Sequence, residues 1–235
     1  MKENIVQEKT SVLIMKNLNG SILDNLLRNS IMKIYLLDIN KEMTDAWHKY
    51  FELPNVEIVN EDFATFMNKH SNIEAIVSPA NSFGLMDGGY DKAITDYFGK
   101  QLMKDVQDVI LRDWYGEQPV GTSISVPIVS RFYDKQIDDG RILQCNPILI
   151  HTPSMRTPEQ IVDSRIVYQC MRTTLIEALR QCVDSIVIPA FGGLTGRVSC
   201  DVIAKMMFLA YRQICNQPNE LGWSYALYIA KELRQ

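Results

Sequence analysis

Histidine and cysteine are scarce in this 235-residue sequence, and neither is arranged as a metal site or a disulfide framework. There are 3 histidines, and the 5 cysteines, at positions 145, 170, 182, 200 and 215, include no C-x-x-C pair. Structural zinc sites need closely spaced ligands, and disulfide-stapled folds use an even set of cysteines. We therefore expect no metal and no cofactor, and we expect most cysteines to be buried and reduced.

Long apolar runs and an excess of basic residues are also missing. No stretch of 18 or more apolar residues occurs, and Lys plus Arg number 24 against 28 Asp plus Glu, for a net charge of −4. A membrane span needs a longer apolar run, and a broad nucleic-acid surface needs net positive charge. The sequence therefore predicts a cytoplasmic protein that binds no membrane and no nucleic acid directly, and it favours a small-molecule ligand.

Glycine and proline are too few for a disordered or fibrous chain. The sequence has 12 Gly and 9 Pro, and 46% of its residues are hydrophobic, which is typical of a globular protein. Its length favours one large domain over two. We expect a single domain over residues 31–235, preceded by an N-terminal appendage at 1–30 that mixes charge and asparagine with short apolar pieces.

Strand-like and helix-like segments alternate along the chain. Apolar β-type runs lie at 31–40, 54–63, 72–81, 121–129, 142–154 and 184–193, the fourth containing Pro127, which favours a sheet edge or a strand end. Helical spacing lies at 41–51, 91–115 with a break at Gly99, 158–180 as the longest helix, and 200–214. The last 14 residues do not distinguish helix from strand. This alternation predicts a mostly parallel sheet covered by helices on both faces.

Two glycine-rich loops follow predicted strands, where α/β sheets place their ligands. The first is SPANSFGLMDGGYDKAI at 78–94, and the second is IPAFGGLTGR at 188–197. Glycine permits positive φ and close approach of the backbone, and free amides at such turns bind phosphate oxygens. Either loop alone is compatible with an ordinary turn, but the two together favour an anionic ligand.

The common nucleotide-binding fingerprints are absent. GGLTGR lacks the lysine of a P-loop, and no G-x-G-x-x-G follows the first predicted strand. Asp38 ends that strand and has the right chemistry for a ribose hydroxyl, but without the glycine turn it is better interpreted as a helix cap.

The two loops, with two further segments, resemble the macrodomain (Appr-1-p processing) family. VSPANSFGLMDGG-Y-D is similar to its first ligand loop, IPAFGGLTG to its phosphate-wrapping loop, LIHTPS to its central strand and NEDF to its acidic turn. The order and spacing match over about residues 33–215. The closer resemblance is to a branch of microbial macrodomain proteins with an S-P-A-N-S-F-G-x-M-D-G-G signature. It implies a three-layer α/β/α fold with a mixed, mostly parallel central sheet.

The resemblance assigns ligand contacts near the adenine and the distal ribose of ADP-ribose. Asp62 would accept a hydrogen bond from the adenine amino group, with the Phe63 backbone beside the base; a helix N-cap is the alternative for Asp62. The Ala80–Asn81 pair would approach the distal ribose, and the Asn81 amide can both donate to and accept from a diol. A turn role is the alternative for Asn81.

The resemblance also assigns the phosphate contacts and a catalytic carboxylate. Asp91 matches an aspartate that orients the attacking water in one hydrolytic subgroup, with Asp87 as the runner-up base and a helix-start role as the alternative. The backbone of Gly88, Gly89 and Tyr90 would approach the ribose and the first phosphate. The second loop would enclose the diphosphate, with positive φ at Gly193 and added charge from Arg197; its other residues are Gly192, Leu194, Thr195 and Gly196.

Two functions from different classes follow. The first is hydrolysis of an ADP-ribose derivative, either an ADP-ribosyl ester or glycoside or ADP-ribose 1″-phosphate, with Asn81 and Asp91 as the catalytic residues and an ADP-ribosylated macromolecule as a further partner. The alternative is a non-catalytic reader or sensor of ADP-ribose or of a related NAD-derived nucleotide. The chain has Ser78 where many macrodomains have asparagine, and its second loop lacks the form common in hydrolytic members. We expect His151 to be a core residue.

Overall fold

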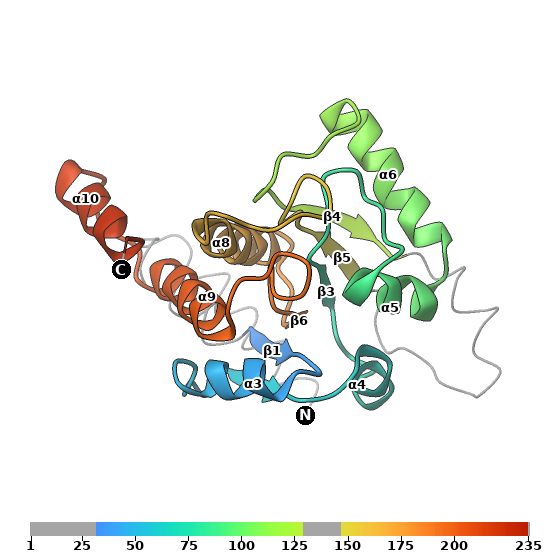
Figure 1. Cartoon of the computed structure of the whole chain (residues 1–235), viewed down its shortest axis with the longest axis horizontal. Coiled ribbons are helices and arrows are strands. Elements are labelled where there is room, and N and C mark those ends of the chain that lie inside the picture. The colour runs from blue at the N-terminus through green and yellow to red at the C-terminus, as the bar shows by residue number, and fades with distance from the viewer. Residues whose placement is uncertain (1–31, 129–146, 235) are drawn as a thin grey trace, which may run out of the picture.

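The structure, a computed structural model of the chain, describes residues 32–128 and 147–234. Helices and strands alternate along these residues, as the sequence predicts (Figure 1). The predicted N-terminal appendage at 1–30 and the first part of the apolar run at 142–154 lie outside the described residues. The division into an appendage and one domain therefore stays a prediction.

A six-stranded sheet forms the centre of the fold, in the order β2-β1-β6-β3-β5-β4. The only antiparallel pair among the described strands is β4 with β5, and β4 lies at the sheet edge with Pro127 as its last residue. This confirms the expected mixed, mostly parallel sheet, and it confirms the edge position that Pro127 indicated. The strands are β1 (Lys33–Leu37), β2 (Val56–Val59), β3 (Ala75–Ser78), β4 (Ile124–Pro127), β5 (Ile148–His151) and β6 (Ser185–Ile188).

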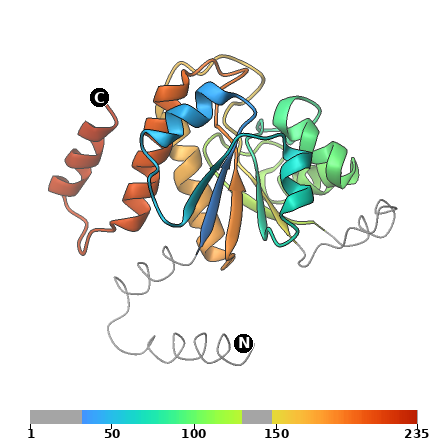
Figure 2. The same ribbon diagram turned by 90° about the horizontal axis from the view of Figure 1, so that it is seen from below.

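Helices cover both faces of the sheet, which gives three layers (Figure 2). One face carries α3 (Lys41–His48), α8 (Arg165–Arg180) and α9 (Cys200–Cys215). The other face carries α4 (Phe63–Lys69), α5 (Gly89–Phe98) and α6 (Gln101–Trp114). A last helix, α10 (Trp223–Glu232), lies outside α9 and buries none of its side chains, so its sequence carries no clear periodic signal.

The central strands are apolar because both of their faces are buried. Every residue of β3 and of β6 is buried, and their side chains alternate between the two cores. Trp47 and Phe191 are the largest fully buried side chains of the first core, and Phe66 and Phe98 those of the second. Such continuous apolar strands are typical of parallel sheets, and they leave the strand ends as the place for polar chemistry.

The predicted helix 158–180 is wrong at its start. The helix α8 begins at Arg165, and Ile161, whose spacing suggested an earlier turn, lies in the preceding loop. The Ile161 N–H donates to the Gly196 carbonyl oxygen at 2.9 Å, so tertiary contact with the second glycine loop holds it outside a helix. Nor is α8 the longest helix, since α9 also has 16 residues.

Three smaller predictions have mixed outcomes. Gly99 separates α5 from α6 with φ of 93°, as predicted. Asn40, and not Asp38, caps α3, because the Asn40 side chain accepts a hydrogen bond from the Glu42 N–H. Of the four described cysteines, all free, only Cys170 is buried, so the expectation that most are buried is wrong for this part of the chain. No helix in the described ranges is long and apolar enough to span a bilayer.

Candidate functional site

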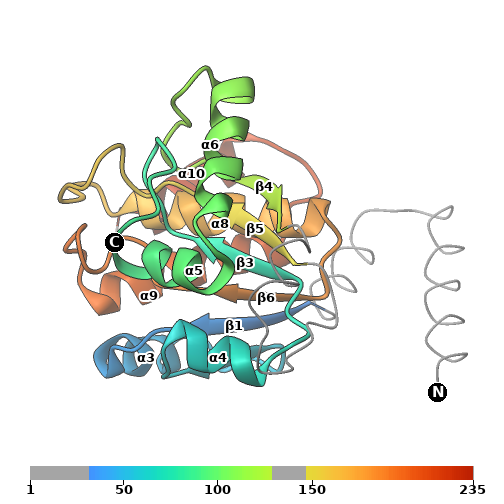
Figure 3. The same ribbon diagram turned by 90° about the vertical axis from the view of Figure 1, so that its right-hand side faces the viewer.

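The carboxyl ends of the central parallel strands meet at one edge of the sheet, and both glycine-rich loops leave from that edge (Figure 3). The first loop follows β3 and the second follows β6, its neighbour in the sheet. Backbone pairing between β3 and β5 continues past the strands, since Thr152 N–H donates to Ser78 O at 3.0 Å and Ser154 N–H donates to Ala80 O at 2.9 Å. The base of the first loop is therefore held as firmly as a strand.

Asn81 uses its amide inside the first loop. Its Nδ2 donates to Leu85 O at 2.8 Å, and its Oδ1 accepts from the N–H groups of Phe83 and Leu85 at 3.1 and 3.3 Å. The side chain therefore builds the turn that carries the rest of the loop, as the alternative interpretation of Asn81 expects. Direct contact of Asn81 with a ribose remains a prediction.

Asp91 is a buried carboxyl group in the first turn of α5. Its residue is 8% exposed, and the Ser78 hydroxyl donates to its Oδ1 at 2.7 Å. Burial raises the pKa of Asp91 to about 7; the bond from Ser78 lowers this pKa, and the negative charge of Asp87 raises it. A carboxyl group with a pKa near neutrality can gain and lose a proton at physiological pH, which suits acid–base chemistry.

Tyr90 packs the start of α5 against the start of α4. Its ring packs edge-on against Phe63 at 5.4 Å between centroids. Its hydroxyl is buried without a hydrogen-bond partner among the described residues. Burial, together with the negative charges of Asp38 and Asp91, raises the Tyr90 pKa far above its ordinary value. Two buried polar groups, the Tyr90 hydroxyl and the Asp91 carboxyl group, therefore lie at consecutive positions in the first turn of α5.

Asp62 is an exposed helix cap. It precedes α4, accepts from the Thr65 N–H at 2.9 Å through Oδ1, and accepts from the Thr65 hydroxyl at 2.6 Å through Oδ2. The hydrogen bonds from Thr65 lower its pKa. The capping role is thus confirmed, and a second acceptor position on each carboxylate oxygen leaves an adenine contact as a prediction.

The second loop curls back on itself through two backbone hydrogen bonds. Arg197 N–H donates to Gly193 O at 3.0 Å, and Val198 N–H donates to Gly192 O at 3.1 Å. The four amides between these closures have no hydrogen-bond partner among the described residues; they belong to Gly193, Leu194, Thr195 and Gly196. Consecutive free amides in a tight turn form a concave anion-binding surface.

The positive φ of this loop lies at a different glycine from the one expected. Gly192 has φ of 75° and Arg197 has φ of 56°, whereas the φ of Gly193 is not positive. The prediction for Gly193 is therefore wrong, because the chain makes its left-handed turn one residue earlier. Arg197 itself is exposed, so its side chain is open to a ligand and to solvent.

The start of α5 is open toward solvent. A Cβ atom added at Gly88 or at Gly89 would meet no atom within 4 Å. The amides of Gly88, Gly89 and Tyr90 form no hydrogen bond with a described residue, and no side chain caps this helix. An anion could therefore approach the positive end of the helix dipole through this space.

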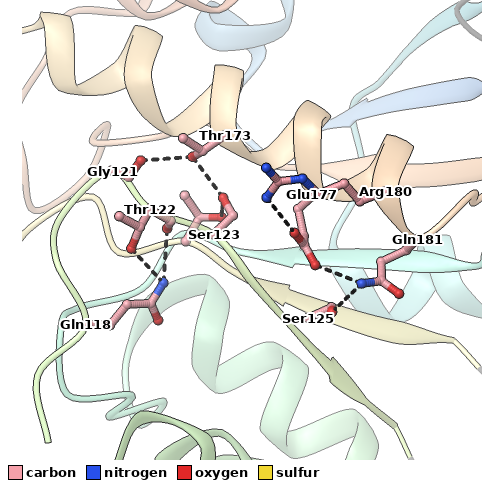
Figure 4. A network of polar contacts seen from close by, with 10 residues as sticks. Gln118, Gly121, Thr122, Ser123, Ser125, Thr173, Glu177, Arg180 and Gln181 are labelled. Carbon is pink, nitrogen blue, oxygen red and sulfur yellow. Dashed lines mark hydrogen bonds and ion pairs between the residues drawn. The ribbon is translucent and has the colours of Figure 1, made fainter. Parts of the chain in front are cut away.

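A network of hydrogen-bonded polar side chains lies at the carboxyl end of β5. His151 is fully buried, with its Nδ1 2.7 Å from Gln118 Oε1, and burial lowers its pKa to about 3, so it is neutral and confirms the expected core residue. Gln118 in turn donates to Thr122 O at 3.1 Å (Figure 4). Further along, Thr173 of α8 donates to Gly121 O at 2.9 Å, and Ser123 connects Thr173 to Thr152.

Sequence reasoning missed the roles of two side chains in the site. The sequence gives no role to the Ser78 hydroxyl, and the resemblance predicts a backbone contact for Tyr90 but no role for its side chain. A polar residue that ends the apolar strand AIVS is a usable signal, because a buried hydroxyl needs a partner. The partner itself, Asp91, is 13 residues away, and only the packing of α5 on β3 identifies it.

Comparison with known proteins now identifies the family. The model of the Macro-like domain family matches residues 54–221. A macrodomain variant from Oceanobacillus iheyensis, solved with ADPR, aligns at 18% identity and a TM-score of 0.50 over 70% of this chain and 87% of its own. The macrodomain of Mycobacterium tuberculosis DarG aligns at 16% identity and a TM-score of 0.47, over 61% of this chain and 84% of that one. With the family model covering most of its length, the chain belongs to the Macro-like domain family.

Proposed function

We propose that the protein binds ADP-ribose at the carboxyl ends of the central strands and hydrolyses an ADP-ribose derivative. The observation that carries the proposal is a pair of loops with unpaired amides that leave the neighbouring strands β3 and β6, the first of them leading into the buried carboxyl group of Asp91. The amides of 193–196 would hold the diphosphate, and those of Gly88, Gly89 and Tyr90 the adjoining phosphate and ribose. The presence of ADPR with the aligned Oceanobacillus macrodomain supports the choice of ligand.

The hydrolytic step places Asp91 as general base. With an ADP-ribosyl ester or glycoside, a water oxygen attacks C1″ as the bond from C1″ to the leaving group breaks and its electron pair departs with that group. The water proton passes to the Asp91 carboxylate, which returns to its ionised form by losing the proton to the leaving group or to solvent. With ADP-ribose 1″-phosphate, the water attacks phosphorus and the bond from phosphorus to the C1″ oxygen breaks; that oxygen leaves with the electron pair and takes a proton, which gives ADP-ribose and inorganic phosphate. Loop amides stabilise the charge that develops.

One observation favours the second candidate, a non-catalytic reader of ADP-ribose. The Asn81 amide, which would align the distal ribose, already forms three hydrogen bonds within its own loop. A reader needs the phosphate loops but not a positioned ribose, so this arrangement fits binding without turnover. An assay of product release from ADP-ribosylated protein and from ADP-ribose 1″-phosphate separates the two.

Three narrower assignments belong to the same proposal. We place the chain in the macrodomain branch with the S-P-A-N-S-F-G-x-M-D-G-G signature, on the strength of residues 78–89. We also propose an ADP-ribosylated macromolecule as a further partner, since the open side of the site faces solvent at Gly88 and Gly89. The four described cysteines are all free, which supports a cytoplasmic location as part of the same proposal.

Calorimetry with ADP-ribose tests the proposal and the role of Asp62. Wild type should bind ADP-ribose more tightly than AMP, and Asp62→Ala should weaken binding by about 1–3 kcal/mol through loss of a charge-assisted acceptor. The control is Asp62→Ser, which restores the helix cap without the carboxylate. Affinity restored to the wild-type level in Asp62→Ser would leave Asp62 as a cap only, and absence of ADP-ribose binding by wild type would refute the proposed function.

A matched pair of glycine substitutions tests the second loop. A Cβ atom at Gly196 would lie 2.5 Å from the Gly192 carbonyl oxygen, whereas one at Gly193 has its nearest neighbour at 3.5 Å. We therefore expect Gly196→Ala to distort the loop and lower ADP-ribose affinity by about tenfold or more, roughly 1.4 kcal/mol. Gly193→Ala should stay within a few fold of wild type. If calorimetry gives both variants the same ADP-ribose affinity as wild type, the phosphates bind elsewhere.

A further inference from the structure

Ser78 is the polar residue that ends β3, and its hydroxyl is buried. The strand reads AIVS, all four residues are buried, and Ser78 is 0% exposed. Its side chain lies on the sheet face that α5 covers, and its hydroxyl donates to Asp91 Oδ1 at 2.7 Å. A buried hydroxyl is costly unless it forms such a bond. Ser78 and Asp91 therefore satisfy each other across the contact between β3 and α5.

The surroundings of Asp91 make this bond the main influence that favours its ionised form. Burial and the charge of Asp87 both raise the Asp91 pKa, and the Ser78 hydroxyl lowers it. Tyr90, on the same helix, is a neutral phenol with a raised pKa, and His151, beside Ser78 in the strand register, is neutral. Among the described residues, neither α4 nor α6 places a charged group that shifts the Asp91 pKa.

We infer that Ser78 is a positioning residue for Asp91: its hydroxyl fixes Oδ1, leaves Oδ2 for the attacking water, and favours the ionised form of the carboxyl group. This inference rests on the proposed hydrolytic function. The Ser78 hydroxyl gives the buried carboxylate of Asp91 its side-chain hydrogen-bond donor. Loss of the donor should favour the neutral carboxyl group, which cannot accept a proton from water.

Titration of Asp91 tests the inference without ligand or turnover. Protein labelled with 13C-aspartate is titrated by NMR, and the Asp91 carboxyl signal is identified by its loss in Asp91→Asn. We expect Ser78→Ala to move the Asp91 midpoint upward by about 1 pH unit, as loss of a charge-assisted hydrogen bond requires. Ser78→Cys, which keeps a weaker donor, should fall between Ser78→Ala and wild type. The matched control is Ser185→Ala. Ser185 is also a buried serine, but it begins β6, at the end of the strand away from the site.

A second measurement follows the reaction. The rise of kcat/KM with pH should move upward by the same amount in Ser78→Ala and should stay in place in Ser185→Ala. An Asp91 midpoint no higher than that of wild type, in Ser78→Ala or, if that variant does not fold, in Ser78→Cys, would overturn the inference. Absence of turnover by wild type, with the midpoint shifted as expected, would instead refute the hydrolytic function on which the inference rests.

Discussion

Replacement of Asp91 by asparagine is expected to lower the turnover of ADP-ribose derivatives by about 100-fold or more while ADP-ribose affinity stays within a few fold. The amide keeps the shape of the carboxyl group and can still accept the hydrogen bond from Ser78, but it cannot take a proton from water. Because the wild-type group is buried with a pKa of about 7, it is poised for that transfer at neutral pH. A group that acts in the transition state affects kcat more than ground-state binding.

Three variants make this result specific. Asp91→Ala should lose as much turnover, but it also leaves the Ser78 hydroxyl without its acceptor, so its stability should be lower than that of Asp91→Asn. Asn81→Ala should damage both binding and turnover, because its amide builds the loop. Asp87→Asn is the control for charge, since Asp87 is the exposed carboxylate of the same loop. Full activity of Asp91→Asn, with activity lost in Asp87→Asn, would assign the base to Asp87.

Asp91→Asn should also change how the free energy of unfolding depends on pH. The Asp91 pKa is about 7 in the folded state against 3.8 for the ordinary group, so between these values the folded state binds more protons than the unfolded state. Wild-type stability contributed by Asp91 therefore falls as pH rises from about 4 to 7. Asp91→Asn removes this loss, so the variant should match wild type near pH 4 and exceed it above pH 7 by up to about 4 kcal/mol.

His151 supplies the opposite dependence and makes the comparison sharper. Burial lowers its pKa from 6.5 to about 3, so the unfolded state binds more protons in this range and stability falls as pH falls. In wild type the contributions of Asp91 and His151 oppose each other between about pH 4 and 6.5, whereas Asp91→Asn leaves the His151 contribution alone. Urea unfolding of both proteins at stepped pH measures the difference. A wild-type-to-variant difference that is constant with pH would show that Asp91 titrates normally.

Local sequence patterns predicted the alternation of strands and helices well, because the spacing of apolar residues depends on whether one or both faces of an element are buried. Continuous apolar runs identified β3 and β6, which are buried on both sides, and Pro127 identified the edge strand because it cannot donate to a neighbour. Gly99 marked the break between α5 and α6 by its positive φ. The two ligand loops could also be located, since glycine clusters after parallel strands occupy a fixed place in such sheets.

What the sequence determined by itself was therefore the order of elements and the residue types at the strand ends. Tertiary structure alone decided which of those residues meet. Ile161 has helical spacing but lies in a loop, because its N–H bonds to Gly196 in the second glycine loop. Ser78 and Asp91 are 13 residues apart, and the packing of α5 on β3 joins them at 2.7 Å. The packing of α5 on β3 also buries Asp91, and burial is the main cause of its raised pKa. Desolvation depends on all the atoms that surround a group in space, so neighbours in the chain do not predict it.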